Sequence, residues 1–270
     1  MAILIKNIKE LVQVEDKPVL LRKGKEMSEL KTIKNAWLFI EDDKIAAFGE
    51  MDNQTLLNKV TENKNFTEIN ASSKMVFPSF CDSHTHLVYA GSREIEYIDK
   101  IKGLSYEEIA KRGGGILNSS ARLHAATEEE LIENAMERLN EIISLGTGAV
   151  EIKSGYGLNT EDELKMLRVI KKLKEISPLT IKSTFLGAHA VPLEYRGRQS
   201  DYVDLIINEM IPMVAAEDLA DYIDVFCDKG FFTVEETDRI LLAGLKYGLR
   251  PKIHANELDY SGGIQVGVKY

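Results

Sequence analysis

The sequence predicts an α/β protein that joins a small N-terminal β-sandwich domain to a (β/α)8 TIM-like barrel of which only about five strands are present. Three observations support this fold class. Residues 1–75 hold short apolar runs with acidic turns, whereas residues 76–270 alternate strand-like and helix-like segments. The last four strand-like runs end near positions 153, 189, 228 and 254, a spacing typical of βα units. Polar side chains that suit chemistry lie at these strand ends, as at the mouth of a barrel.

Residues 1–75 are expected to form the small β domain. Ile3–Ile5 is a short apolar strand, and Ala36–Ile40 and Ile45–Gly49 form a hairpin around the acidic turn 41–44. No catalytic pattern is found in this part, so the chemistry is expected in residues 76–270.

Residues 76–270 are expected to form the barrel. Strands are expected within 77–86, 150–157, 180–189, 222–228 and 251–257. Amphipathic helices at Glu128–Leu145 and Glu161–Ile176 lie between strands, which implies parallel pairing through crossovers. Capping boxes are expected to start helices at Ser105, Thr127, Thr160 and Thr233, and glycines to end them at Gly146, Gly244 and Gly248.

A doubly wound open sheet is the structural alternative. Such a sheet would normally carry a glycine-rich phosphate loop after its first strand, and no such loop follows 77–86. Five strands do not close an eight-stranded barrel. Because 263–270 has the pattern of an unfinished helix, the chain is expected to be part of a longer sequence.

The composition narrows the classes of function. The net charge is 34 − 43 = −9, which argues against a nucleic-acid partner, since phosphate backbones attract clustered lysine and arginine. Two cysteines far apart, Cys81 and Cys227, do not make a disulfide framework. Because the apolar run after Met1 is short and no run approaches the length of a membrane span, neither a signal peptide nor a transmembrane segment is expected. A cytoplasmic protein without a membrane partner is therefore expected.

An H-x-H pair, His84 and His86, gives the first sign of chemistry. Residues i and i+2 of a strand point to the same face, so the two imidazoles form half of a chelating site for Zn or Fe. His189 and His254 end later strands, and strand ends far apart in sequence meet at one mouth of a barrel. These four histidines predict a metal site. His124 has no such placement and is expected on the surface or in packing.

Other polar residues near the strand ends have both structural and functional interpretations. Lys153 is expected in an ion pair inside the barrel, Cys227 in the core, and Asp228 as an acceptor for backbone N–H groups. For Tyr156, binding and packing are equally supported.

Two charged residues leave a similar choice. Arg93 is either a salt bridge at the rim or a clamp for a carboxylate, since its planar fork suits bidentate anions. Glu257 is either the partner of a lysine or, beside a metal-bound water, a proton shuttle.

Several separated motifs carry a family resemblance that covers nearly all of the chain. They are Phe80-Cys81-Asp82-Ser83-His84-Thr85-His86, Leu87-Val88-Tyr89-Ala90-Gly91-Ser92-Arg93, Gly113-Gly114-Gly115-Ile116, Glu151-Ile152-Lys153-Ser154-Gly155-Tyr156-Gly157-Leu158, Phe185-Leu186-Gly187-Ala188-His189-Ala190-Val191-Pro192 and His254-Ala255-Asn256-Glu257. The first, behind a small β unit, resembles the amidohydrolase superfamily of metal-dependent hydrolases. Together they resemble its imidazolonepropionase family, which acts in histidine degradation.

The resemblance implies hydrolysis of 4-imidazolone-5-propanoate to N-formimidoyl-L-glutamate with one Zn or Fe ion, and a homodimer. The residues that match by motif are the metal ligands His84, His86 and His254, the substrate-binding residues Arg93, Tyr156, His189 and Glu257, and the catalytic residues Glu257 and His189. Two family features, a further histidine and a metal-binding aspartate on later strands, are expected beyond Tyr270.

The residues suggest a mechanism and leave alternatives. Metal-derived hydroxide would attack the ring carbonyl, and His189 would donate a hydrogen bond to the oxyanion. Glu257 would move a proton to the leaving nitrogen, while Arg93 held the propanoate carboxylate. The alternatives are another cyclic amidohydrolase, a ring deaminase or a barrel that serves as a non-catalytic scaffold. A turnover panel separates the enzymes, and metal analysis tests the scaffold.

Overall fold

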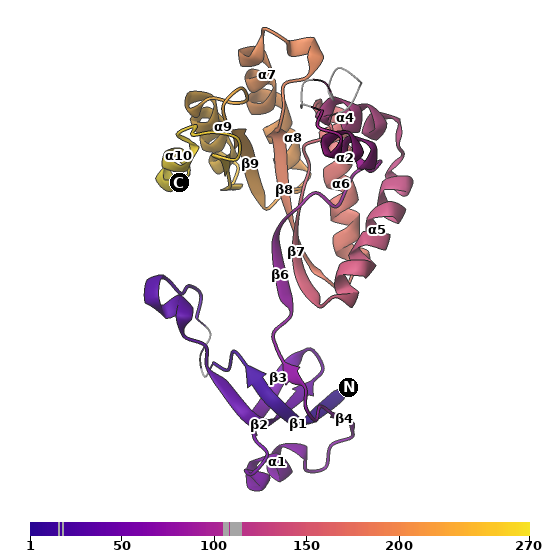
Figure 1. Ribbon diagram of the computed structural model, residues 1–270, viewed down its shortest axis with the longest axis vertical. Helices are drawn as coiled ribbons and strands as arrows, with labels where there is room; N and C mark the ends of the chain where they lie inside the picture. Colours follow the sequence, from indigo (N-terminus) through magenta and orange to yellow (C-terminus); the bar gives the residue numbers. More distant parts are fainter. Residues whose placement is uncertain (16, 18, 105–107, 109–114) are drawn as a thin grey trace. The chain divides into compact units, whose positions relative to one another are not determined.

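The computed structural model describes residues 1–15, 17, 19–104, 108 and 115–270, and it divides into two compact units, Met1–Ser79 and Phe80–Tyr270 (Figure 1). In the first unit the elements are β1 (Ala2–Val12), η1 (Gly24–Ser28), β2 (Thr32–Glu41), β3 (Lys44–Glu50), α1 (Gln54–Thr61), β4 (Phe66–Asn70) and β5 (Met75–Val76). The predicted hairpin is confirmed, because β2 and β3 pair antiparallel.

The first unit is built on one sheet in the order β3-β2-β1-β4, with β5 beside β1. The apolar run in β2 serves both faces: Trp37 and Phe39 pack with Leu57 of α1, whereas Ala36 and Leu38 pack in a separate cluster on Ile8 and Leu11. Within the described residues this unit has no second sheet, so the β-sandwich stays a prediction.

The second unit alternates strands and helices. Its elements are β6 (Phe80–Thr85), α2 (Glu94–Ile101), α4 (Ile116–Ala125), α5 (Glu128–Ser144), β7 (Thr147–Lys153), α6 (Thr160–Ile176), β8 (Thr180–Ala188), η2 (Leu193–Tyr195), α7 (Gln199–Leu205), η3 (Ile206–Met210), α8 (Ile211–Ala216), β9 (Tyr222–Cys227), α9 (Val234–Lys246), β10 (Arg250–Pro251), β11 (His254–Ala255) and α10 (Gly263–Lys269). The strands run parallel in the order β10-β9-β8-β7-β6, and β11 also pairs with β9.

The two faces of the parallel sheet differ in chemistry. Side chains of one parity, such as Ile152, Phe185 and Val225, are buried in the hydrophobic core, where α5, α6 and α9 pack on β7, β8 and β9. Side chains of the other parity include Lys153 and Asp224, which are also buried but paired with each other. This is the pattern of a barrel wall, with helices outside and a polar interior.

Two predicted capping boxes are confirmed, at Thr127 and Thr233. The prediction at Thr160 is wrong by one residue: Asn159 caps α6, because the carboxylate of Glu163 binds the preceding loop instead. The predicted start at Ser105 lies outside the described residues, as do Gly113 and Gly114.

Glycines end two of the helices as predicted. Gly146 and Gly248 follow α5 and α9 with positive φ. Gly244 does not end a helix, because it lies inside α9. A Cβ there would approach Ile223 of β9 to 2.7 Å, so this glycine permits close packing of helix on strand.

Candidate metal centre

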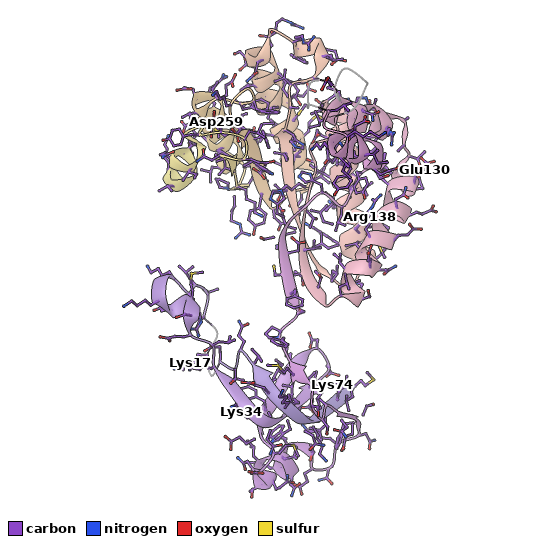
Figure 2. The ribbon with its side chains drawn as sticks, viewed as in Figure 1. Lys17, Lys34, Lys74, Glu130, Arg138 and Asp259 are labelled. Carbon is purple, nitrogen blue, oxygen red and sulfur yellow. The ribbon has the colours of Figure 1, made fainter. Side chains whose placement is uncertain are left out.

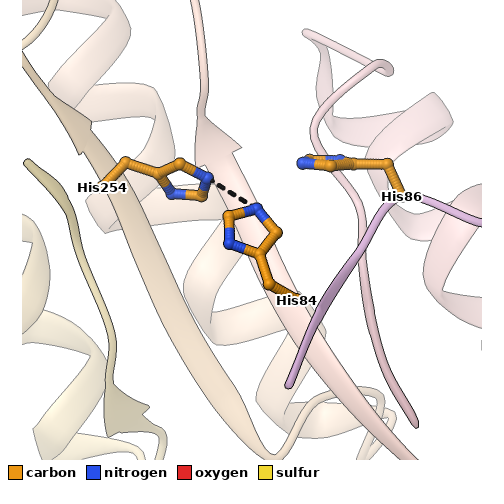
Figure 3. Close-up of side chains that lie close together, drawn as sticks. All are labelled: His84, His86 and His254. Carbon is orange, nitrogen blue, oxygen red and sulfur yellow. Dashed lines mark hydrogen bonds between the residues drawn. The ribbon is translucent and has the colours of Figure 1, made fainter. Parts of the chain in front are cut away.

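Three histidines meet at the carboxyl ends of the strands. His84 belongs to β6, His86 follows that strand directly, and His254 begins β11. One nitrogen of each imidazole lies within 4.8 Å of the others, and Nε2 of His84 lies 3.0 Å from Nε2 of His254 (Figure 3). The parallel order of the sheet brings together residues 170 positions apart.

The three imidazoles fit a transition-metal ion. Burial lowers the pKa of His86 to about 3, with further lowering from the nearby His189. Burial also lowers the pKa of His84, assisted by the charge of Lys153. Both rings are therefore neutral near pH 7, which is the form that binds metal. Nδ1 of His86 is buried without a hydrogen-bond partner among the described residues.

A buried charged network supports His254. Its Nδ1 lies 3.1 Å from Oδ2 of Asp224, and that carboxylate oxygen lies 2.8 Å from Nζ of Lys153. Lys153 also pairs with Glu151 at 2.7 Å, which confirms the ion pair predicted for Lys153. Burial would raise the pKa of Asp224, but the hydrogen bond and charge of His254, with those of Lys153, hold it down to about 2. Asp224 is thus an anion that orients the His254 ring.

Replacing Asp224 by Asn is expected to weaken Zn²⁺ binding by about 10- to 100-fold, because a carboxylate behind a metal-binding imidazole fixes its orientation and raises its basicity. Competition with a chromophoric chelator measures the affinity. Asp221→Asn is the matched control, since Asp221 precedes the same strand but binds Lys174 and Lys182. Equal affinities for the two variants would remove this role from Asp224.

One cavity of about 810 Å³ opens beside the histidines and contains every residue predicted for the site. Its lining residues are His84, His86, Arg93, Lys100, Ile116, Tyr156, His189, Phe226, Phe231, His254, Glu257 and Leu258. Apolar and aromatic walls with few polar groups are typical of a small-molecule site.

His189 stands beside the histidine cluster at the end of β8. Its ring stacks on His86 at 5.3 Å between centroids with an interplanar angle of 15°. Nδ1 lies 2.9 Å from the carbonyl oxygen of Gly155. A carbonyl only accepts, so Nδ1 carries the proton. Burial lowers the pKa of His189 to about 4, so the ring is neutral and its Nε2 is an acceptor.

Arg93 directly precedes α2. Its guanidinium both forms a salt bridge and lines the cavity, so it meets the two interpretations drawn from the sequence. Its Nε donates to Oε2 of Glu96 at 2.7 Å, and Glu96 is buried and also accepts from the backbone N–H of Gly115. The guanidinium thus forms an ion pair while it lines the cavity. Burial raises the pKa of the Tyr156 hydroxyl, although the charge of Arg93 acts against this rise.

Glu257 is held in place through its backbone. The carboxylate of Asp228 accepts hydrogen bonds from the N–H groups of Glu257 and Leu258 at 2.7 and 2.9 Å and from Asp259 at 3.2 Å. This confirms the expectation that Asp228 accepts backbone bonds. Figure 2 labels Asp259 in this turn. Asp228 therefore fixes the turn that presents Glu257 to the cavity.

The remaining candidates lie outside the cavity. Cys227 is buried in the core and unpaired, as expected. His124 lies on α4, where its Nε2 is 2.7 Å from the carbonyl oxygen of Gly157.

Arg138 of α5, labelled in Figure 2, donates to the carbonyl of Leu87 and lies over the ring of Tyr89, so it anchors the segment after His86.

Sequence reasoning missed the supporting residues Asp224 and Glu163. The sequence pattern does mark Asp224, because it is a charged residue at an alternate position of the otherwise apolar strand Tyr222–Cys227. For Glu163 the pattern is misleading, because its position fits a capping box that begins at Thr160.

The chain is similar in sequence to imidazolonepropionases from several bacteria. Over all 270 residues it is 57% identical to imidazolonepropionase from Christiangramia forsetii and 56% identical to that from Flavobacterium johnsoniae. It is 44% identical over 246 residues to imidazolonepropionase from Clostridium tetani. The chain spans 64% of the first two relatives and 58% of the third, which fits the expectation drawn from its five strands. No family model matches the chain.

Solved structures share the fold at low identity. A 5-methylcytosine deaminase from Klebsiella pneumoniae superimposes with a TM-score of 0.65 at 15% identity, over 98% of this chain and 55% of the deaminase. An uncharacterized metal-dependent hydrolase from Pyrococcus furiosus gives 0.59 at 11% identity, over 100% of this chain and 69% of its own. These likenesses show that the chain shares the fold of these proteins over the length that it spans. Over the length that it spans, the chain is therefore similar to imidazolonepropionases, as its motifs predicted.

Proposed function

We propose that the chain carries the metal site and the substrate cavity of an enzyme that hydrolyses the cyclic amide of 4-imidazolone-5-propanoate to N-formimidoyl-L-glutamate in histidine catabolism. The observation that supports this most is the single cavity that holds three clustered imidazoles together with Arg93, Tyr156, His189 and Glu257. The similarity to imidazolonepropionases over the full chain supports the substrate.

His84, His86 and His254 would hold one Zn or Fe ion, since neutral imidazoles suit both metals. Such an ion supplies a water of lowered pKa, and hence a nucleophile near neutral pH, with charge for the developing oxyanion. Asp224 keeps the His254 ring in place, and His86 is held between the end of β6 and His189. The ligand set is therefore rigid before the substrate arrives.

His189 takes a role different from the hydrogen-bond donor expected from the sequence. Its only ring proton is directed to the carbonyl of Gly155, so the neutral ring offers Nε2 as an acceptor to the cavity. We propose that this nitrogen accepts a hydrogen bond from a ring N–H of the substrate. His189 then orients the ring, and stabilisation of the oxyanion falls to the metal site.

Glu257 would transfer the proton, and Arg93 would bind the carboxylate of the substrate. Glu257 faces the cavity from a turn fixed by Asp228, where its carboxylate can carry a proton from the nucleophile toward the leaving ring nitrogen. Arg93 would bind the propanoate carboxylate and hold the ring against the imidazoles. Glu96 fixes the guanidinium, so the clamp is in place before binding.

Replacing Arg93 by Ala is expected to raise KM for 4-imidazolone-5-propanoate by about 10- to 100-fold, the cost of about 1.5–3 kcal/mol for one charge-assisted bond, with a smaller effect on kcat. Steady-state kinetics measure both. Arg93→Lys keeps the charge but not the planar fork and should give an intermediate KM. An unchanged KM in Arg93→Ala would show that Arg93 does not bind the substrate carboxylate.

Turnover of 4-imidazolone-5-propanoate against a panel of cytosine, 5-methylcytosine and guanine tests the reaction class. Preference for a neutral base would favour a ring deaminase.

No helix among the described residues is long and apolar enough to cross a membrane. A homodimer in the cytoplasm is the assembly and setting that we propose, and light scattering tests the dimer.

A further inference from the structure

A buried carboxylate lies beneath the loop that carries Tyr156. Glu163, in the first turn of α6, is fully buried. Its Oε1 accepts from the backbone N–H groups of Gly157 at 2.7 Å and Leu158 at 3.1 Å, and its Oε2 accepts from Gly155 at 3.1 Å. Three backbone donors therefore converge on the two oxygens of one side chain.

The backbone of this loop needs such a partner. Gly155 has φ +112° and Leu158 φ +55°, so their N–H groups leave the regular pairing of β7. Buried N–H groups without partners would destabilise the fold. The approach is close, because a Cβ on Gly157 would come within 2.3 Å of the backbone nitrogen of Glu163. The glycines and the carboxylate therefore fit one another.

A second side chain holds the same loop from α4. Nε2 of His124 lies 2.7 Å from the carbonyl oxygen of Gly157 and therefore donates to it. Gly157 is thus bound at its N–H by Glu163 and at its carbonyl by His124.

The loop controls two residues of the cavity. The carbonyl of Gly155 accepts from Nδ1 of His189, which determines the tautomer of that ring. Tyr156, the next residue, places its ring 5.5 Å from His86 and 5.5 Å from His189. The orientation of one peptide thus decides which nitrogen of His189 faces the cavity.

We propose that Glu163 is a positioning residue for substrate recognition: its carboxylate folds the loop 154–158 so that the Gly155 carbonyl keeps His189 in the Nδ1–H form and Tyr156 on the cavity wall. The assignment of the tautomer stands on these contacts alone, and only the effect on ligand binding rests on the proposed function. Glu163 touches neither the metal ligands nor the cavity in this account.

Glu163→Gln tests the proposal, with Glu161→Gln as the matched control on the exposed side of the same helical turn. The amide keeps the shape of the side chain but sets an N–H donor against a backbone N–H. Imidazole ¹⁵N NMR reads the tautomers directly, and the chain has only five histidines, so His189→Gln assigns the signal. Calorimetry with imidazole-4-propanoate, a stable ring bearing the same carboxylate arm, reads binding.

In the wild type and in Glu161→Gln we expect His189 in the Nδ1–H form. In Glu163→Gln we expect a mixed or Nε2–H population and a Kd for imidazole-4-propanoate raised by about 10- to 100-fold, as a small misplacement in a site produces. Zn²⁺ affinity should stay within about twofold, since the three ligands are untouched. A merely structural residue would lower the unfolding midpoint without moving the tautomer.

An unchanged His189 tautomer in folded Glu163→Gln would overturn the proposal. If that variant does not fold, hydrogen exchange in the wild type decides: slow exchange of the Gly155, Gly157 and Leu158 amides supports the clamp, and fast exchange overturns it. If the wild type shows the expected tautomer but no affinity for imidazole-4-propanoate, the proposed function fails while the loop assignment stands.

Discussion

Replacing His84 by Ala is expected to remove the bound metal ion and to lower kcat/KM for 4-imidazolone-5-propanoate by roughly a thousandfold or more. The metal is expected to provide several kcal/mol of transition-state stabilisation, and each 1.36 kcal/mol is about tenfold in rate. His84 is the most exposed of the three ligands, so its loss should leave the fold intact. Metal content by mass spectrometry and steady-state kinetics measure the two effects.

His124→Ala is the control for metal content, because His124 is the histidine that lies outside the cavity. It should keep one Zn or Fe ion per chain. If His84→Ala keeps its metal as well, the cluster is a packing arrangement of imidazoles, and the non-catalytic scaffold becomes the better account.

Replacing Glu257 by Gln is expected to lower kcat by about 10²- to 10⁴-fold, the usual contribution of a positioned general acid–base. The amide has the shape of the carboxylate but cannot carry the proton. The backbone N–H of Glu257 still binds Asp228, so the turn should keep its place. Metal content should not change, which separates this effect from loss of the ion.

Asp259→Asn provides the matched control, since Asp259 lies in the same turn but pairs with Lys229 at the surface. Its kcat should match that of the wild type. A kcat for Glu257→Gln within a few-fold of the wild type would show that another group moves the proton.

Much of the fold could be predicted because its signals are local. Apolar runs indicated the strands, helical periodicity indicated α5 and α6, and the H-x-H pair pointed to the candidate metal site at a strand end. The helices α2, α4, α7 and α8 were not predicted. The errors arose where tertiary contacts decide the local structure. Thr160-x-x-Glu163 fits a capping box, yet Glu163 binds the loop before the helix and Asn159 becomes the cap. Gly244 looks like a helix end but serves close packing on Ile223.

The candidate metal ligands and the residues of the cavity were predictable because the strand ends of a parallel sheet converge. Their supporting contacts were not. The pairing of Asp224 with His254 and Lys153, the anchor of Arg93 on Glu96, and the proton on Nδ1 of His189 depend on side-chain geometry across the sheet. The last of these leads us to propose that His189 accepts a hydrogen bond from the substrate rather than donating one to the oxyanion.

The decisive measurement is turnover of 4-imidazolone-5-propanoate before and after removal of metal by a chelator. We expect hydrolysis to N-formimidoyl-L-glutamate by the metal-loaded protein, loss of this activity on chelation, and recovery with one equivalent of Zn²⁺ or Fe²⁺ per chain. Absence of turnover in the fully metal-loaded protein, or turnover that survives complete removal of the metal, would contradict this expectation.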